Sequence, residues 1–311
     1  MENLGVYDNV RTLRFERRLP VGASALWPYL AEPETTAVWR SRCEFEPRVG
    51  GAAVIAGTVD GKPVHGSVTA WSPGERLAFS VPGLTDAAED RHEVSYALAA
   101  DGGATVLTLT HRLPRGWIGG WTGGEWHAGL DALALALSGA EAETVAATRK
   151  PSEALVAAYN NAFLDARAKQ PGEHMRDFFA VTPFHATLGL ELVEVSRDRL
   201  VGRLASKGRL TLPGGHRMHG GAAAAAMDAV AAYHAAMAAE ARVAETGKGE
   251  RGLGFNTATT GLSVDYLRPL RAESYSVTTS LLHAGSKLIR IRAEMADDEG
   301  PVAVATATFT C

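Results

Sequence analysis

An alanine-rich stretch occupies residues 222–239 and directly follows Met218-His219-Gly220-Gly221. Alanine has the highest helix propensity, and its small side chain lets neighbouring elements approach the helix closely. The run therefore predicts a long helix at the centre of a domain, with a sheet wrapped around it. The two glycines leave backbone N–H groups at the helix start, where an anion or a developing oxyanion is favoured. Two turns further along, Asp228 is a candidate base.

Composition limits what this helix can belong to. The chain has 311 residues, of which 46% are hydrophobic and 21% charged, and its net charge is −4. This length predicts two domains of an ordinary globular protein. No basic stripe is present, so nucleic acid and a membrane surface are not expected partners. Cys43 and Cys311 indicate neither a disulfide framework nor a metal site, and residues 1–10 show no signal pattern, so we expect a cytoplasmic protein.

The first half of the chain is typical of strands separated by turn signals, such as Asp60-Gly61 and Ser72-Pro73-Gly74. The expected strands are 10–17, 52–59, 63–71, 75–81, 91–99 and 104–112, and the expected helices are 24–31 and a longer one from Thr122. Apolar residues recur at helical spacing in the longer helix, at Trp126, Leu130, Leu133 and Leu137. Such a stripe predicts a helix that covers a sheet.

This order of elements is the helix-grip arrangement, and several motifs within it are informative. They are Ala25-Leu26-Trp27, Pro33-Glu34, Trp39, Gly50-Gly51, Pro73-Gly74-Glu75-Arg76-Leu77 and Gly124-Glu125-Trp126. With these motifs the region resembles the START-like (SRPBCC) superfamily and, within it, the homologues of the heat-shock protein 90 ATPase activators. The resemblance implies an α+β ligand-binding domain at residues 8–140, which encloses an apolar cavity for a hydrophobic acyl or aromatic ligand.

Two groups of residues in this half have alternative interpretations. Six aromatic residues can fill the core or line a cavity, and we favour the core: Trp27, Trp39, Trp71, Trp126, Phe45 and Phe79. His111 and the glycine-rich segment 116–121 are interpreted as a solvated histidine and a flexible loop. A cavity mouth is the alternative for this second group.

The middle of the chain indicates a join between two domains. Residues 141–174 contain a helix-like stretch at 152–169 and two proline breakers, and we interpret them as a helical linker. The following segment, 175–311, carries the alanine-rich helix among candidate strands rich in Val, Thr and Ile. These strands are 190–195, 199–206, 252–267, 273–283, 287–295 and 302–310. The pattern predicts a curled antiparallel sheet wrapped around one long central helix.

A second resemblance rests on the motifs of this half and their spacing. They are Pro183-Phe184, Leu188-Gly189-Leu190, His219-Gly220-Gly221, Asp228 nine residues after that histidine, and Val264-Asp265-Tyr266-Leu267-Arg268-Pro269. Together they make residues 175–311 resemble a hotdog-fold acyl-CoA thioesterase of the phenylacetate-pathway type. The resemblance implies an enzyme that hydrolyses acyl-CoA or aryl-CoA thioesters. It also implies that the protein needs no cofactor and no metal, with coenzyme A entering only as part of the substrate.

The resemblance further implies roles for individual residues. Asp228 of the partner subunit would be the general base or nucleophile, and the Gly220 amide would polarise the thioester carbonyl. Thr259, seven residues before Tyr266, would position water, and His219 would hold the turn before the helix. Substrate-binding roles fall on three further residues, Gly221, His216 and Arg268. Gly220 and Asp228 are separated by about 12 Å along one helix, so the site would span a homodimer, or a dimer of dimers.

Two observations leave alternatives open. Asp228, on a helix of Ala, Met and Val, is expected to have a raised pKa, but it can also be a structural carboxylate that Thr259 hydrogen-bonds. Pro213 stands where many members of the resembled family have Asn, and proline has no N–H and no side-chain amide to donate. Either His216 substitutes for that group, or activity is reduced. The alternative function is a non-catalytic, hydrophobic-ligand-binding or chaperone-associated protein that dimerises through its hotdog half.

Overall fold

The computed structural model describes residues 4–59, 61–85, 90–117, 119–169, 171–206, 208–246 and 257–310. It divides into two compact units, Met1–Gln170 and Pro171–Cys311, each with its own sheet. Asp60, Lys207, Cys311 and residues 252–256 of one expected strand lie outside the described residues.

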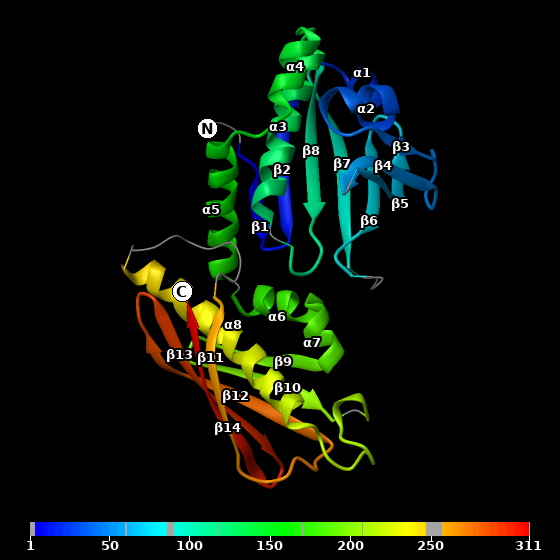
Figure 1. Ribbon diagram of the computed structural model, residues 1–311. Helices are drawn as coiled ribbons and strands as arrows, with labels where there is room; N and C mark the ends of the chain where they lie inside the picture. The colour runs from blue at the N-terminus through cyan, green and yellow to red at the C-terminus, as the bar shows by residue number, and fades with distance from the viewer. Residues whose placement is uncertain are drawn as a thin grey trace. The chain divides into compact units, whose positions relative to one another are not determined.

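The first unit is an eight-stranded antiparallel sheet with one long helix along its face (Figure 1). The strands, in the order β1-β2-β8-β7-β6-β5-β4-β3, are β1 Val6–Asn9, β2 Thr12–Leu19, β3 Cys43–Phe45, β4 Ala52–Val59, β5 Lys62–Ser72, β6 Arg76–Pro82, β7 Arg91–Asp101 and β8 Ala104–Arg112. The helices are α1 Ala23–Ala31, α2 Pro33–Trp39, α3 Gly119–Leu137, α4 Ala142–Thr148 and α5 Glu153–Lys169. This is the predicted helix-grip fold.

The apolar stripe that the sequence predicts for the longer helix lies on α3. Trp126, Leu130 and Leu133 are buried, as are Leu13 and Leu109 on strands of the sheet. The helix predicted to begin near Thr122 begins three residues earlier, at Gly119. Thr122 therefore lies within the first turn of α3, and its hydroxyl accepts a hydrogen bond from Trp117 Nε1 at 3.0 Å.

The region predicted as a linker consists of helices. α4 and α5 belong to the first unit, where both pack against α3, and the second unit begins with α6 Pro171–Val181. Small residues allow this close packing, because a Cβ added at Gly123 would lie 2.4 Å from the Tyr159 ring.

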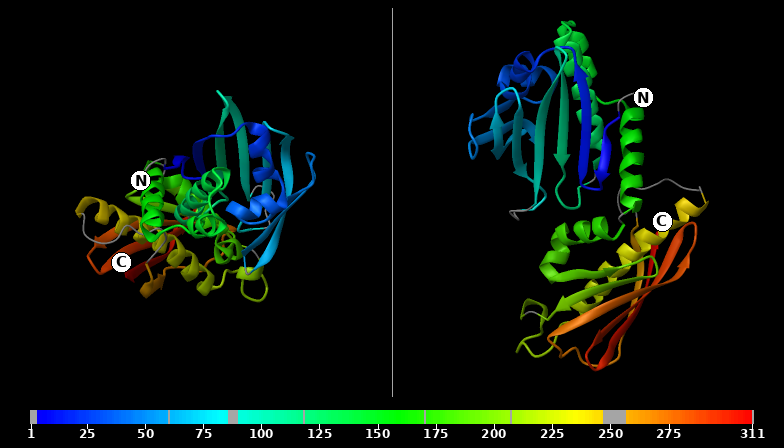
Figure 2. Two further views of the ribbon diagram at one scale, coloured as in Figure 1. Left: turned by 90° about the horizontal axis from the view of Figure 1, so that it is seen from above. Right: turned by 180° about the vertical axis from the view of Figure 1, so that it is seen from behind.

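The second unit is a six-stranded antiparallel sheet that curves around one helix (Figure 2). The strands, in the order β11-β14-β13-β12-β10-β9, are β9 Leu190–Val195, β10 Arg199–Ala205, β11 Thr259–Tyr266, β12 Ser274–Ala284, β13 Leu288–Asp297 and β14 Gly300–Thr310. The helices are α6, α7 Pro183–Leu188, the 3-10 turn Gly208–Leu210 and the central α8 Gly220–Thr246. This is the predicted hotdog fold.

Alanine brings α8 close to the sheet. Ala223, Ala226 and Val230 are fully buried in one core with strand residues of β10, β12 and β13. Gly202 on β10 shows how tight the contact is, because an added Cβ would lie 2.7 Å from Val230. Within the described part of the chain, α8 is the helix long and apolar enough to cross a membrane, but most of its apolar stretch is buried inside this unit. Core packing accounts for its composition.

Candidate active site at the start of the central helix

The loop before α8 is fixed to the domain on both sides. The Met218 N–H donates to the Leu270 carbonyl at 2.8 Å, and the His219 N–H donates to the Leu210 carbonyl at 2.7 Å. Met218 is also buried in the core of this unit. The direction in which the helix starts is therefore set by backbone hydrogen bonds rather than by the exposed loop at 213–217.

The His219 side chain caps the helix start. Its Nδ1 accepts a hydrogen bond from the Gly221 N–H at 2.9 Å, so this nitrogen is the unprotonated one. The Gly220 N–H has no acceptor among the described residues of this chain. A free N–H at the positive end of a helix dipole is a suitable donor for a developing oxyanion.

Tyr266 explains why residue 220 is glycine. A Cβ at Gly220 would lie 3.1 Å from the Tyr266 ring and from its hydroxyl oxygen. That hydroxyl donates a hydrogen bond to the Gly220 carbonyl at 2.6 Å. The sequence analysis used Tyr266 only as the reference point for locating Thr259 and did not predict this contact, although Tyr266 belongs to the motif at residues 264–269. The tyrosine ties the end of β11 to the first turn of α8.

Asp228 and Thr259 are brought together from α8 and the start of β11. The Thr259 hydroxyl donates a hydrogen bond to Asp228 Oδ1 at 3.0 Å. Partial burial raises the pKa of the Asp228 carboxyl, and the hydrogen bond from Thr259 opposes that rise in part. The pair can therefore act as a base with a water-positioning hydroxyl, and it can equally be a satisfied structural contact.

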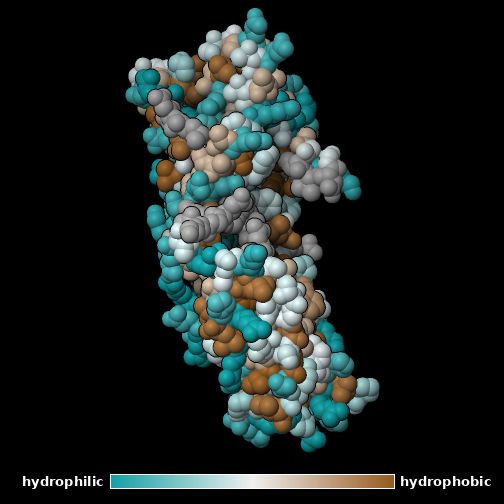
Figure 3. All heavy atoms as spheres, turned by 60° about the vertical axis from the view of Figure 1, so that its left-hand side comes forward, coloured by the Kyte–Doolittle hydropathy of each residue, from teal (hydrophilic) through white to brown (hydrophobic). Residues whose placement is uncertain are grey.

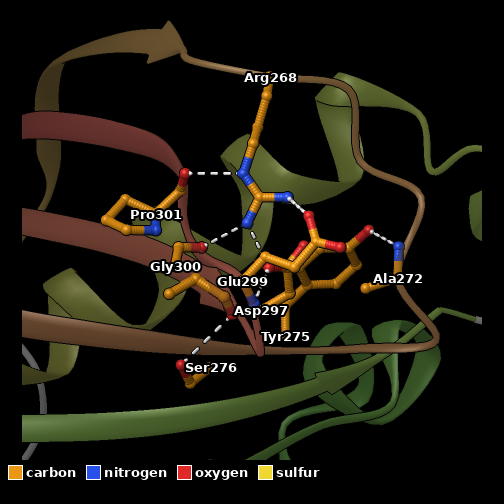
Figure 4. Close-up of polar contacts among 9 residues, drawn as sticks. Arg268, Ala272, Tyr275, Ser276, Asp297, Glu299, Gly300 and Pro301 are labelled. Atoms are coloured by element: carbon orange, nitrogen blue, oxygen red, sulfur yellow. Dashed lines mark hydrogen bonds and ion pairs between the residues drawn. The ribbon is translucent and has the colours of Figure 1, made fainter.

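The remaining predicted residues do not join this pair. His216 is exposed in the loop, and no contact described for the chain links it to Asp228 or Gly220. Arg268 is fully engaged within its own unit (Figure 4). Its guanidinium pairs with Asp297 and with Glu299, and it donates to the Gly300 carbonyl at 2.8 Å and the Pro301 carbonyl at 3.2 Å. A role for Arg268 in binding coenzyme A stays a prediction.

One chain therefore holds two halves of a possible site, separated along α8. Gly220 and Asp228 are eight residues apart on the helix, which corresponds to about 12 Å. A thioester carbonyl held by the Gly220 N–H is out of reach of Asp228 in the same chain.

The first unit contains a second concave site, a cavity of about 510 Å³. Its wall includes Trp39, Phe79 and Trp126 together with His92 and His111. Trp39 and Trp126 are almost fully buried, so the preferred interpretation as core is right for them, yet both also line the cavity.

The interpretation of His111 as a solvated residue is wrong. Its side chain is 6% exposed, its Nδ1 accepts a hydrogen bond from Trp126 Nε1 at 2.8 Å, and its Nε2 lies 2.9 Å from His92 Nδ1. Burial lowers the pKa of His111 well below its usual value, and His92 and Arg40 lower it further. Two histidines 19 residues apart become neighbours because β7 and β8 pair in this register. Sequence spacing carries no signal for that contact.

No group of three or more His, Cys, Asp or Glu residues is placed to hold a metal ion in the part of the chain that the structure describes.

Comparisons with known proteins match two segments of the chain to two different families. The family model of the thioesterase superfamily matches residues 215–304, and the model of Activator of Hsp90 ATPase homolog 1-like protein matches residues 20–137. The medium/long-chain acyl-CoA thioesterase YigI of Escherichia coli K12 is 34% identical over 132 residues, which are 41% of this chain and 84% of that protein. The protein of the same name from Salmonella typhimurium is 33% identical, with the same coverage.

Two solved structures each match part of the chain. A putative thioesterase of Ralstonia eutropha, described as related to phenylacetic acid degradation, is 23% identical and covers 44% of this chain and 96% of its own, with a TM-score of 0.36. A thioesterase of Haemophilus influenzae is 13% identical and covers 44% of this chain and 87% of its own, with a TM-score of 0.37.

Proposed function

Because this chain belongs to the thioesterase superfamily, it is a thioester hydrolase, and we propose that it hydrolyses acyl-CoA or aryl-CoA thioesters at a site completed by a second copy of itself. The observation that supports the proposal is the pairing of Asp228 with Thr259 in a chain whose free Gly220 N–H lies out of their reach. The E. coli relative carries medium/long-chain acyl-CoA in its name, and chains of that length are the first to be tested.

The reaction needs only a water molecule and the groups already described. Asp228 of the partner subunit takes a proton from water while the water oxygen attacks the thioester carbonyl carbon. The Gly220 N–H donates to the carbonyl oxygen as it gains negative charge. The tetrahedral intermediate then expels the thiolate of coenzyme A, which takes the proton back from the Asp228 carboxyl. In this scheme the protein supplies no cofactor, and it acts in the cytoplasm, where acyl-CoA is made.

The raised pKa of Asp228 fits this role. A base works best when its pKa approaches the pH at which it acts, and partial burial moves the Asp228 carboxyl in that direction. Desolvation also makes the ionised carboxylate a stronger base than one in water. The Thr259 hydroxyl keeps that carboxylate oriented.

The two edges of the second sheet favour β11 as the dimer contact. α6 packs along β9 at one edge, whereas β11 pairs with β14 on one side and leaves its other side open among the described residues. Hydrophobic residues reach the surface of this unit among polar ones, as the brown spheres in Figure 3 show. On β11, Leu262 is 38% exposed and Tyr266 is 48% exposed. An open edge strand with exposed apolar side chains is suited to pairing with a second copy.

The first test is Asp228→Asn, which keeps the shape of the side chain and removes the base. We expect kcat for a series of acyl-CoA thioesters, followed by thiol release, to fall by about 10²–10⁴-fold. Unchanged hydrolysis by the Asp228→Asn variant would contradict the role of Asp228 as the base. If the wild-type protein also hydrolyses none of the thioesters, the role of Pro213 becomes decisive, and the non-catalytic ligand-binding alternative is favoured.

A second variant tests the oxyanion donor independently. Gly220→Ala places a Cβ 3.1 Å from Tyr266 and so displaces the first turn of α8. Gly208→Ala is the matched control, because a Cβ there meets nothing within 4 Å. The Gly220 variant is expected to lose activity in the same assay while the control retains it.

A further inference from the structure

Arg40 is a cation in the wall of the first-unit cavity. It follows the last residue of α2, and its guanidinium lies 4.0 Å from the centre of the Trp126 ring. Its Nη1 donates a hydrogen bond to the Tyr96 hydroxyl at 2.6 Å. Both the arginine and the tryptophan line the cavity. The positive charge is thus held against an aromatic face in the wall of the cavity.

The described residues around Arg40 form no ion pair in direct contact with its guanidinium. Burial raises the pKa of Tyr96 to about 12, although Arg40 opposes the rise, so the tyrosine stays neutral. Burial likewise raises the pKa of the nearby Cys43 thiol. Glu125 is the acidic residue whose charge reaches Arg40, but it is exposed, and the described ion pairs of the chain do not join the two. A buried charge is costly unless a counter-ion is supplied.

The histidine pair adds a second donor to the same cavity. The indole N–H of Trp126 can only donate, so Nδ1 of His111 must accept, and a neutral His111 then carries its proton on Nε2. That proton is donated to His92 Nδ1 at 2.9 Å. Burial lowers the pKa of His92 to about 4, so His92 is neutral and carries its own proton on Nε2. No acceptor for this Nε2–H is present among the residues that the structure describes.

The cavity therefore combines aromatic walls with two polar donors, and the acidic residue in its wall, Glu125, forms no described ion pair with Arg40. An uncharged apolar ligand would leave the His92 Nε2–H without an acceptor and Arg40 without an ion pair. A ligand with a carboxylate at one end would satisfy them, because a guanidinium binds carboxylates through charge-assisted hydrogen bonds. A volume of about 510 Å³ is in the range of small-molecule sites.

We propose that the first unit binds an apolar monocarboxylic acid, with the carboxylate at Arg40 and His92 and the apolar body among Trp39, Phe79 and Trp126. Such an acid is also the class of product that thioester hydrolysis releases, so the first unit would retain the acid that the second unit forms. Only this connection rests on the proposed function. The carboxylate site itself rests on the geometry of the first unit.

Tryptophan fluorescence tests the proposal in the full-length protein. All six tryptophans belong to the first unit, so a saturable change in their emission reports binding there and not in the second unit. The ligands are decanoic acid and 4-phenylbutyric acid, which separate aliphatic from aromatic bodies, and decanol is the neutral control. We expect one or both acids to bind at least tenfold more tightly than decanol.

Arg40→Gln tests the role of the charge. We expect the affinity for the acid to fall by about 10- to 100-fold, the range for one charge-assisted hydrogen bond, while decanol binding is unchanged. Equal affinity of decanol and decanoate for the wild-type protein would overturn the proposal, as would full acid affinity in a folded Arg40→Gln protein. If that variant does not fold, Arg40→Lys, which keeps the charge, must preserve the preference for acid over alcohol. Loss of hydrolysis in Asp228→Asn with intact acid binding would leave this inference standing.

Discussion

The two candidate sites of this chain differ in how much of each site one copy supplies. The cavity of the first unit draws its aromatic walls, Arg40 and the histidine pair from a single unit. The site at the start of α8 has its oxyanion donor at Gly220 and its carboxylate at Asp228, out of reach of each other on one helix. In the first unit, a helix packed on a sheet leaves a cavity that can hold a ligand. In the second unit, a sheet wrapped around α8 leaves Thr259 on the open edge strand β11. The first architecture suits retention of a molecule, and the second suits chemistry at an interface.

The largest effect is expected from a variant that disrupts the proposed dimer, because it should impair the second site and leave the first unchanged. Leu262→Lys places a charge on the exposed side of β11, where we propose that two copies pair. Because an edge lysine opposes strand pairing, the dimer should dissociate, and hydrolysis should fall by roughly 100-fold or more. Acid binding by the first unit should not change. Sedimentation velocity, thiol release and tryptophan fluorescence measure the three quantities.

Leu282→Lys is the control for this variant. Leu282 is 54% exposed but lies on β12, inside the sheet rather than at its edge. It should leave the oligomeric state and hydrolysis unchanged. A fully active monomeric Leu262→Lys protein would contradict the idea that the second site needs two copies.

A smaller effect is expected when the Asp228–Thr259 contact is removed. Thr259→Val keeps the shape of the side chain but deletes the hydrogen bond that lowers the Asp228 pKa, so that pKa should rise further above its usual value. Since the base acts only when ionised, activity is lost as the pH falls through this pKa. The acid limb of the pH–rate profile should move to higher pH, with kcat reduced about tenfold at neutral pH.

Thr260→Val, one residue further along β11, is the matched control. The Thr260 hydroxyl donates to the Thr308 carbonyl and not to Asp228. It should leave the acid limb of the profile in place. An acid limb that does not move in Thr259→Val would show that Asp228 is a structural carboxylate and not the base.

The smallest effect is expected in the first unit. Trp126→Phe removes the donor to His111 Nδ1, so His111 is no longer held in one tautomer and His92 is no longer fixed as a donor to the cavity. Acid affinity, measured by isothermal titration calorimetry, should fall by about 3- to 10-fold, and hydrolysis by the second unit should be unchanged. Trp71→Phe, which removes an indole that does not line the cavity, should bind the acid normally. If both variants bind alike, the histidine pair has no part in the site.

Much of the fold could be predicted because its signals are local. The alanine run fixed α8, and turn signals placed β4, β8 and β9 at their observed bounds. His234 on α8 is a core histidine whose hydrogen bonds are satisfied, because its ring contacts the Thr279 hydroxyl at 2.9 Å and the Arg197 carbonyl at 3.1 Å. Helical and strand periodicity act over a few residues, so a single sequence contains them. Motif spacing likewise located Gly220, Asp228 and Thr259 as candidates.

Contacts between distant segments were decided by the tertiary structure alone. Tyr266 reaches Gly220 from β11, and Arg40 meets Tyr96 and Trp126 from three separate elements. Arg268, which looked available to a substrate, is held by Asp297 and Glu299. Charge and residue type can be read from a sequence, but whether a charge finds its partner depends on register and packing. Sequence thus determined which chemical groups this protein has, and folding determined which of them remain unpaired and available to a ligand.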